Sequence, residues 1–145
     1  MEIRETKIED LKELAFLYKQ NYYGESDVIT NEKGMIKQFK KLKKNKNYIF
    51  ISAVENQKLI GFCQGVLNYE IIENQQPVLT IWNMRILPEY RRQGVGKNIM
   101  DMAEKFAKKN NAIGIFVGCD FENIIAQNFY KKLNYKEDFG YFKHL

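Results

Sequence analysis

The segment Leu87-Pro88-Glu89-Tyr90-Arg91-Arg92-Gln93-Gly94-Val95-Gly96-Lys97 decides the fold prediction, because it joins a predicted strand over Val78–Leu87 to a predicted helix over Gly94–Asn110. Its proline cannot extend a strand ladder, so the chain turns there. Its two glycines lack the Cβ atoms that would keep a bulky anion away from the backbone. The helix directs unpaired N–H groups and the positive end of its dipole into the turn. The segment therefore predicts a site for a pyrophosphate group.

Two other phosphate-binding loops do not fit this spacing. A Walker A loop needs glycine at position 91 and serine or threonine at position 98, where this chain has Arg91 and Asn98. The dinucleotide fingerprint needs a third glycine at the position of Ile99, and the segment comes late in the chain, after a predicted hairpin. Both interpretations fail.

Regular patterns on either side place this segment inside a mixed α/β sheet (α+β). Towards the C-terminus, strand and helix patterns alternate, and towards the N-terminus two strand patterns form an antiparallel hairpin. We expect one domain over residues 1–145, with about six to seven strands flanked by about four helices. The further elements are strands over Met1–Thr6, Tyr48–Val54, Leu59–Ile72 and Ala112–Cys119, one or two closing strands after Tyr135, and helices from near Ile8, around Met35–Leu42 and over Asn123–Leu133.

The composition is that of an ordinary globular protein, with 45% hydrophobic and 28% charged residues and two prolines among 145 residues. No apolar run is long enough for a membrane span or a signal peptide, so we expect a cytoplasmic protein without a membrane partner. The formal charge of +5 favours an anionic partner without choosing which one.

Two cysteines and one histidine bear on redox and metal chemistry. Cys63 and Cys119 each lie in an apolar, strand-like run, so we expect two buried free thiols and a reducing compartment. No zinc-ligand spacing is present, and we expect no metal site. A nucleophile–base pair of Cys119 with His144 is disfavoured by their separation and by the apolar surroundings of the thiol.

A lysine-rich stretch in the first half raises the alternative of a nucleic-acid-binding protein. No known nucleic-acid-binding motif accompanies it, and a solvated helix face is the commoner meaning of such a pattern. We therefore expect no nucleic-acid partner. The lysines are Lys37, Lys40, Lys41, Lys43, Lys44 and Lys46.

Two blocks of sequence resemble the GNAT superfamily of N-acetyltransferases. Arg91-Arg92-Gln93-Gly94-Val95-Gly96 matches the signature of that family, which is Arg or Gln, two residues, Gly, one residue, then Gly or Ala. The block from Asn123 to Tyr135 is similar to the family's Asn-x-x-Ala helix with its Phe-Tyr pair. It departs from the family at Asn134, where glycine is usual, and asparagine is the other residue that commonly adopts the left-handed conformation at a helix end.

The resemblance implies a GNAT-like fold and acetyl-CoA as cosubstrate. It also implies that backbone of Met84, Arg85 and Ile86 pairs with the pantetheine arm, and that a backbone N–H there polarises the thioester carbonyl. Tyr130 matches the family's general acid, which protonates the departing thiolate. The implied cofactor-binding residues are Met84, Arg85, Ile86, Arg91, Arg92, Gln93, Gly94, Val95, Gly96, Lys97 and Asn123.

The general base is not predicted. Many family members carry a carboxylate on the strand before the Gly-rich turn, whereas Thr80-Ile81-Trp82-Asn83 has none. Glu70, Glu73 or a water chain are left as candidates. The substrate is also open, although an aromatic and acidic rim would suit a cationic amine. The residues of that rim are Tyr22, Tyr23, Glu25, Asp27, Glu137, Asp138 and Tyr141.

These observations favour an N-acetyltransferase that moves an acetyl group to a primary amine of a small molecule or peptide, by direct attack in a ternary complex. A non-catalytic acyl-CoA sensor is the main alternative, because the strand carboxylate is missing. Two purely structural interpretations are also left open. Tyr130 could be a core residue beside Phe129, and Asn123 could be a helix cap. A homodimer is left open.

Overall fold

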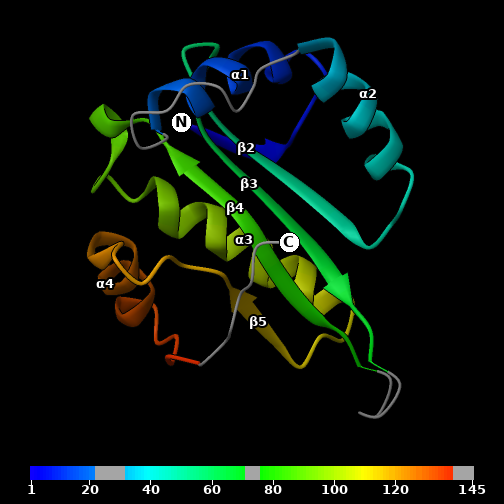
Figure 1. The fold of residues 1–145 in the computed structure, drawn as a ribbon, viewed down its shortest axis with the longest axis vertical. Helices are drawn as coiled ribbons and strands as arrows, with labels where there is room; N and C mark the ends of the chain where they lie inside the picture. The colour runs from blue at the N-terminus through cyan, green and yellow to red at the C-terminus, as the bar shows by residue number, and fades with distance from the viewer. Residues whose placement is uncertain (22–31, 71–75, 139–145) are drawn as a thin grey trace.

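A computed structural model describes residues 1–21, 32–70 and 76–138 of the chain. Within this part, five strands form one mixed sheet in the order β1 to β5 (Figure 1). The first three pairings are antiparallel, and β4 and β5 pair in parallel. The strands are β1 (Glu2–Glu5), β2 (Tyr48–Glu55), β3 (Lys58–Asn68), β4 (Val78–Ile86) and β5 (Gly114–Val117).

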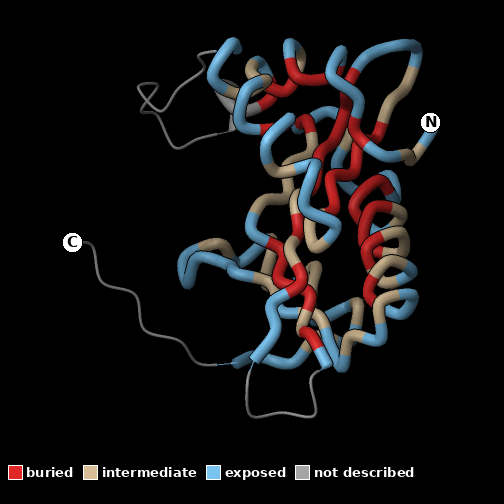
Figure 2. The backbone as a smooth tube through the Cα atoms, turned by 90° about the vertical axis from the view of Figure 1, so that its right-hand side faces the viewer, coloured by how far each residue is buried: buried red, intermediate tan, exposed pale blue. Residues whose placement is uncertain are grey.

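Helices cover both faces of the sheet. α3 packs on one face, where a Cβ on Gly61 of β3 would meet Ile99 and Val95 of that helix at 3.1 and 3.3 Å. α2 packs on the opposite face, where Phe39 meets Phe50 of β2 with ring centroids 5.0 Å apart. Figure 2 shows α3 on one side of the sheet with its buried residues turned inward. The helices are α1 (Asp10–Asn21), α2 (Glu32–Lys43), α3 (Val95–Lys109) and α4 (Ile124–Lys132), with a 3-10 turn at Pro88–Tyr90.

The mixed α/β sheet and the element order predicted from the sequence are confirmed, and every strand except β2 is shorter than expected. The described part contains five strands rather than six or seven. Residues 136–138 form no strand, and the rest of the predicted closing strands lies outside the described residues. The strand predicted over Ala112–Cys119 is confined to Gly114–Val117, because Ile113 and Phe116 are exposed and only one side of this segment packs on the core.

The prediction that both thiols are buried is wrong for Cys119. Cys63 is fully buried in β3, but Cys119 lies beyond the end of β5 and is exposed. Both cysteines are free, as expected. No helix in the described part of the chain is long and apolar enough to cross a bilayer.

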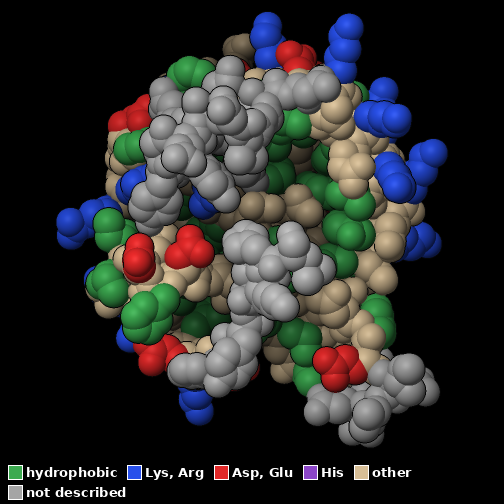
Figure 3. Space-filling view, viewed as in Figure 1, with side chains coloured by type: hydrophobic (Ala, Val, Ile, Leu, Met, Phe, Trp, Pro, Cys, Tyr) green, Lys and Arg blue, Asp and Glu red, His purple; other side chains and the backbone are tan. Residues whose placement is uncertain are grey.

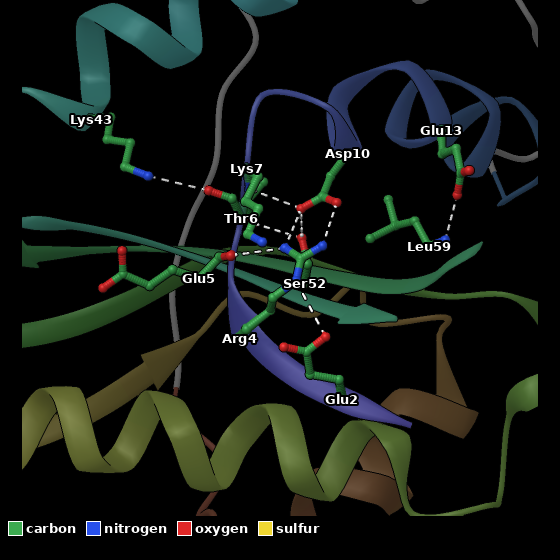
Figure 4. A network of polar contacts seen from close by, with 10 residues as sticks. All are labelled: Glu2, Arg4, Glu5, Thr6, Lys7, Asp10, Glu13, Lys43, Ser52 and Leu59. Atoms are coloured by element: carbon green, nitrogen blue, oxygen red, sulfur yellow. Dashed lines mark hydrogen bonds and ion pairs between the residues drawn. The ribbon is translucent and has the colours of Figure 1, made fainter. Parts of the chain in front are cut away.

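A buried polar network holds the first strand against the first helix (Figure 4). Arg4 donates two hydrogen bonds to the carboxylate of Asp10, at 2.7 and 2.8 Å. The Lys7 backbone N–H and the Ser52 hydroxyl also donate to Asp10, and Thr6 pairs with Ser52 at 2.9 Å. Asp10 is only 8% exposed, so its charge depends on these donors. The network therefore ties β1, α1 and β2 together.

We expect Asp10→Ala to lower the free energy of unfolding by about 3 kcal/mol, because it leaves the Arg4 guanidinium half-buried without its bidentate partner. Glu104→Ala is the matched control, since it breaks an exposed pair with Lys108 that is worth about 0.5 kcal/mol or less. Urea unfolding measures both. Equal losses in the two variants would contradict a special role for the Asp10 network.

The same network predicts a loss of stability in acid. Burial alone raises the pKa of Asp10, but the hydrogen bonds from Arg4, Lys7 and Ser52 outweigh it and hold this pKa below its ordinary value. A depressed carboxyl pKa stabilises the fold above the unfolded-state value and loses that effect as the pH falls through the folded-state value. Asp10→Ala should therefore flatten the fall in stability below about pH 4.

Candidate active site

The strands β4 and β5 separate partway along β4. Their parallel pairing runs from Val78–Gly114 to Ile81–Val117 and is followed by one hydrogen bond of 3.4 Å, from the Gly118 N–H to the Ile81 carbonyl. β4 then continues to Ile86 beside β3 alone (Figure 1). Its outer edge beyond Ile81 is therefore without a partner strand among the described residues, and we call it the open edge.

A β-bulge lies where the open edge begins. Gln64 pairs with Asn83 and the next residue, Gly65, pairs with Ile81, so Trp82 is an extra residue in β4. The sequence interpretation missed this bulge. The signal was present in the spacing of the apolar residues, because Leu79 and Ile81 are two apart whereas Ile81 and Met84 are three apart.

Backbone polar groups of Met84 and Ile86 face the open edge. The Leu87 N–H donates to the Ile60 carbonyl at 2.9 Å, so Leu87 faces β3. Because successive residues of a strand direct these groups to opposite sides, Arg85 also faces β3, and Met84 and Ile86 face outward. The Ile86 carbonyl already accepts from Nε of Arg91 at 3.2 Å. The backbone N–H and carbonyl of Met84 therefore point to the open edge, where an added strand would pair with them.

The turn before α3 presents backbone amides close to this edge. Gly94 is the N-cap residue with φ +83°, a conformation that favours glycine, and a Cβ built on it meets nothing within 4 Å. The first intrahelical bond runs from the Asn98 N–H to the Gly94 carbonyl. The N–H groups of Val95, Gly96 and Lys97 therefore have no helical acceptor and are suited to an anion.

The charged and polar side chains of the turn are exposed, but several already form a hydrogen bond or an ion pair within the protein. Arg91 contacts the Ile86 carbonyl, and Gln93 donates to the Glu89 carbonyl at 2.7 Å. Lys97 lies 2.8 Å from Asp101, and this hydrogen bond raises the pKa of the lysine above its ordinary value. Arg92 has φ +61° and an exposed side chain. Backbone amides, more than side-chain charges, are thus the groups that this turn leaves available to an anion.

Gly96 has a packing function in addition to the cofactor contact predicted for it, which stays a prediction. A Cβ there would lie 3.0 Å from Cε of Met84, 3.0 Å from Cζ of Phe129 and 3.1 Å from Cδ1 of Ile86. These three side chains come from β4 and α4, so the glycine allows α3 to approach both elements closely. Of the two glycines, only Gly94 leaves room for a ligand.

Tyr130 lies against the open edge from the side of α4. Its hydroxyl is 3.8 Å from the sulfur of Met84, and its ring packs edge-on against Phe129 at 5.1 Å. Burial raises the pKa of this phenol above its ordinary value, and the nearby Cys63 and Cys119 add to the shift. The phenol is therefore protonated at neutral pH, the form that a proton donor requires, and burial makes it a weaker acid than an ordinary tyrosine. This arrangement brings Tyr130 and Met84 together, although they are 46 positions apart.

The ends of α4 hold Tyr130 in place. Asn123 caps the helix, because its side-chain oxygen accepts from the Ala126 N–H at 3.1 Å. At the other end Asn134 has φ +65°, and the Tyr135 N–H returns to the Tyr130 carbonyl at 3.0 Å, which completes a Schellman motif. The expectation that Asn134 ends this helix in a left-handed conformation is confirmed. The contact of Asn123 with a cofactor stays a prediction.

The remaining candidate groups do not assemble into a second catalytic set. Burial raises the pKa of Cys63 to about 12, and burial with Asp120 raises that of Cys119, so neither thiol is activated. Glu70 follows the end of β3 where Asn68 pairs with Val78, six residues and about 20 Å along β4 from Met84. Among the described residues, no three His, Cys, Asp or Glu side chains gather as a metal site.

Several residues named from the sequence lie outside the described part of the chain, namely Tyr22, Tyr23, Glu25, Asp27, Glu73, Tyr141 and His144. Of the predicted acidic rim, Glu137 forms an ion pair with Lys131 at 2.6 Å. The lysines after position 36 are exposed on and just beyond α2, and Figure 3 shows them at the upper right. This is the arrangement of a solvated helix face.

The two glycines of the turn should respond differently to substitution. Gly94→Ala places a methyl group in the space of the predicted pyrophosphate and should raise the Kd for coenzyme A about tenfold or more. Gly96→Ala overpacks the junction of α3, β4 and α4 and should lower stability by about 1–3 kcal/mol. Gly114→Ala is the control, because a Cβ there meets nothing within 4 Å and no positive φ is present. Calorimetric titration and thermal unfolding separate the effects; equal coenzyme A affinity in Gly94→Ala and Gly114→Ala would contradict the assignment.

Comparison with known proteins agrees with this geometry. A spermidine N(1)-acetyltransferase of Thermoplasma acidophilum is 24% identical, with 94% of this chain and 88% of the relative covered. A solved structure described as a transcriptional regulator from Bacillus halodurans has a TM-score of 0.90 at 23% identity, covering 99% of this chain and 98% of the other. The aminoglycoside N-acetyltransferase AAC(6')-Iy in complex with CoA has a TM-score of 0.82 at 17% identity, covering 99% and 93%.

The two solved structures establish the similarity of the fold. The family is established separately, because the model of the Acetyltransferase (GNAT) family matches residues 8–135. That match includes the open edge, the turn before α3 and the whole of α4. This chain therefore belongs to the Acetyltransferase (GNAT) family and is an N-acetyltransferase.

Proposed function

We propose that the protein transfers the acetyl group of acetyl-CoA to a primary amine of a small molecule or peptide, by direct attack in a ternary complex. The observation that carries this proposal is the placement of the Tyr130 hydroxyl 3.8 Å from Met84, at the start of an open strand edge that leads to the amides of α3. A candidate acid, an open strand edge and unpaired amides at the start of α3 together support this proposal.

The residues present fit acetyl-CoA. The Gly94 N-cap leaves open space beside the amides of Val95 and Gly96, which suits a pyrophosphate. The outward-facing backbone of Met84 can pair with an amide-containing arm as an added strand does. The solved relative AAC(6')-Iy, whose structure contains CoA, supports this use of the fold. Arg92 and Lys97 add positive charge at the rim of the turn.

When bound, the thioester supplies an activated acetyl group with a thiolate leaving group. The Met84 N–H would stabilise negative charge on the carbonyl oxygen as the amine attacks. The Tyr130 phenol, which is protonated at neutral pH, would protonate the departing sulfur. The amine attacks in its neutral form and releases a proton as the new amide bond forms.

The proton from the amine leaves to water in this proposal. β4 carries no carboxylate, and Glu70 lies at the far end of the strand from Met84. The alternative of a non-catalytic acyl-CoA sensor rests on the same missing carboxylate. Cys63 and Cys119 are both free thiols, which supports a reducing, cytoplasmic setting as part of the proposal.

Release of free coenzyme A thiol from acetyl-CoA, followed across a panel of amines, tests the proposal. We expect turnover with at least one primary amine, and coenzyme A should raise the midpoint of thermal unfolding by an amount that grows with the logarithm of its concentration above Kd. Cofactor binding without turnover on any amine would favour the sensor. Absence of any thermal shift would remove the coenzyme A site itself.

Tyr130→Phe should lower kcat about 100-fold while leaving the Kd for acetyl-CoA within about twofold, because the ring still packs against Phe129 and only the proton donor is lost. Tyr135→Phe is the control, because its ring lies beside that of Tyr130, with centroids 5.8 Å apart, and it loses a phenol hydroxyl in the same way. Steady-state kinetics on the acetylated amine measure kcat. An unchanged kcat in Tyr130→Phe would rule out the phenol as the acid.

A further inference from the structure

Three consecutive side chains at the open edge alternate between the two faces of the sheet. Met84 and Ile86 face α3, because atoms of both lie 3.0–3.1 Å from a Cβ built on Gly96. Successive side chains of a strand point to opposite faces, so the side chain of Arg85 faces away from α3. The residue next to Met84 therefore holds a guanidinium group on the face of the sheet opposite α3.

This second face is the one from which an amine can approach. On the α3 face, the Tyr130 hydroxyl lies 3.8 Å from the Met84 sulfur and occupies the space beside it. Ile81 also faces α3, since its Cδ1 lies 2.9 Å from a Cβ built on Gly65, so Trp82 faces away. Trp82 is 60% exposed, which leaves the second face open to solvent near Met84. An amine that reaches a thioester beside Met84 thus passes over the face that carries the guanidinium.

The guanidinium of Arg85 is held at the sheet instead of extending into solvent. The residue is half-buried, and its Nε atom is buried. Its charge also reaches the opposite face: burial raises the pKa of Tyr130, whereas the positive charge of Arg85 acts to lower it. A charge that acts on a phenol across the strand also acts on an amine bound on its own face.

The other charged side chains on this face are engaged elsewhere. β3 and β4 contain no Asp or Glu, and the lysine of β3, Lys58, lies 3.3 Å from Glu89. α1 lies over the same face, and its two acidic residues, Asp10 and Glu13, accept hydrogen bonds within the fold (Figure 4). Among the described residues of these elements, Arg85 is thus the charged group that adjoins Met84.

We propose that the charge of Arg85 makes the acceptor site bind a primary amine in its neutral, reactive form. The inference rests on the proposed acetyl transfer. A positive charge within about 4–6 Å disfavours the protonated state of an amine. The amine then gives its extra proton to water as it binds, and no carboxylate is needed to remove it. Arg85 therefore accounts for a strand before the Gly-rich turn that lacks a general base.

The protons balance along this path. An ammonium group releases one proton to water as it binds. The nitrogen lone pair attacks the thioester carbon, the C–S bond breaks, and the sulfur takes the proton of Tyr130. The new amide nitrogen loses a second proton to water, and Tyr130 regains one from water. One proton is therefore released for each acetyl group transferred to an ammonium substrate.

Proton release on binding tests the inference without turnover. The probe is glycylglycinamide, whose single titratable group is an α-amino group with an ordinary pKa of about 7.7–8.0. It is titrated calorimetrically into the coenzyme A-bound protein at pH 7.5, in buffers of different ionisation enthalpy. Because the pKa of the bound amine should be about one unit lower, binding should release about 0.5 proton.

Variants assign this release to the charge. Arg85→Gln should release almost no proton, and Arg85→Lys should restore most of the release because the charge is kept. Lys105→Gln is the matched control, since it removes one positive charge from an exposed position on α3 and should release as much as the wild type. Equal release by the wild type and Arg85→Gln would overturn the proposal.

The pH dependence of turnover provides a second readout. At saturating acetyl-CoA, kcat reports the complex with bound amine, and kcat/KM reports the free species. With glycylglycinamide, the apparent pKa of kcat should lie about one unit below that of kcat/KM in the wild type and coincide with it in Arg85→Gln. A purely structural defect would lower both parameters without moving either pKa.

The two readouts separate this inference from the proposed function. If no amine is acetylated, but binding releases the proton in the wild type and not in Arg85→Gln, acetyl transfer fails and the inference stands. If acetylation occurs and the two apparent pKa values already coincide in the wild type, acetyl transfer stands and the inference is overturned.

Discussion

Four parallel residue pairs join β4 to β5 and end at Ile81 and Val117, and most of the proposed site depends on where they end. If the pairing continued to Ile86, the outward backbone groups of Met84 would be used within the sheet. The bulge at Trp82 marks the same point in the pairing with β3. One change of strand geometry therefore produces the open edge, the outward Met84 and the exposed tryptophan.

The elements around this point were predictable from local patterns, but their details were not. The helix α3 and the turn before it follow from apolar spacing, Pro88 and the two glycines, which are local signals. The different functions of Gly94 and Gly96 depend on contacts with Met84 and Phe129, which lie far away in the sequence. The exposure of Cys119 likewise depends on where β5 stops, and strand ends carry weak local signals.

The surroundings of the candidate acid, Tyr130, also depend on residues that are distant in the sequence. The sequence predicted Tyr130 only through resemblance, and its environment comes from three separate elements. Met84 of β4 lies at its hydroxyl, Cys63 of β3 contributes to its raised pKa, and Tyr135 closes the helix end beneath it. The rigid ends of α4 matter here, because an acid must hold its position relative to the strand edge for proton transfer to be efficient.

The close approach at Gly96 also bears on how relatives of this protein can diverge. The signature of the family admits alanine at this position, yet here a methyl group would meet Met84, Ile86 and Phe129 at 3.0–3.1 Å. Interiors are packed too tightly to absorb such a change without a matching loss of volume. Relatives that carry alanine at this position should therefore carry smaller side chains at one of those three. Substitutions at these four positions would then be coupled during evolution. The quantity that is conserved would be the total volume of the side chains packed where α3, α4 and β4 meet.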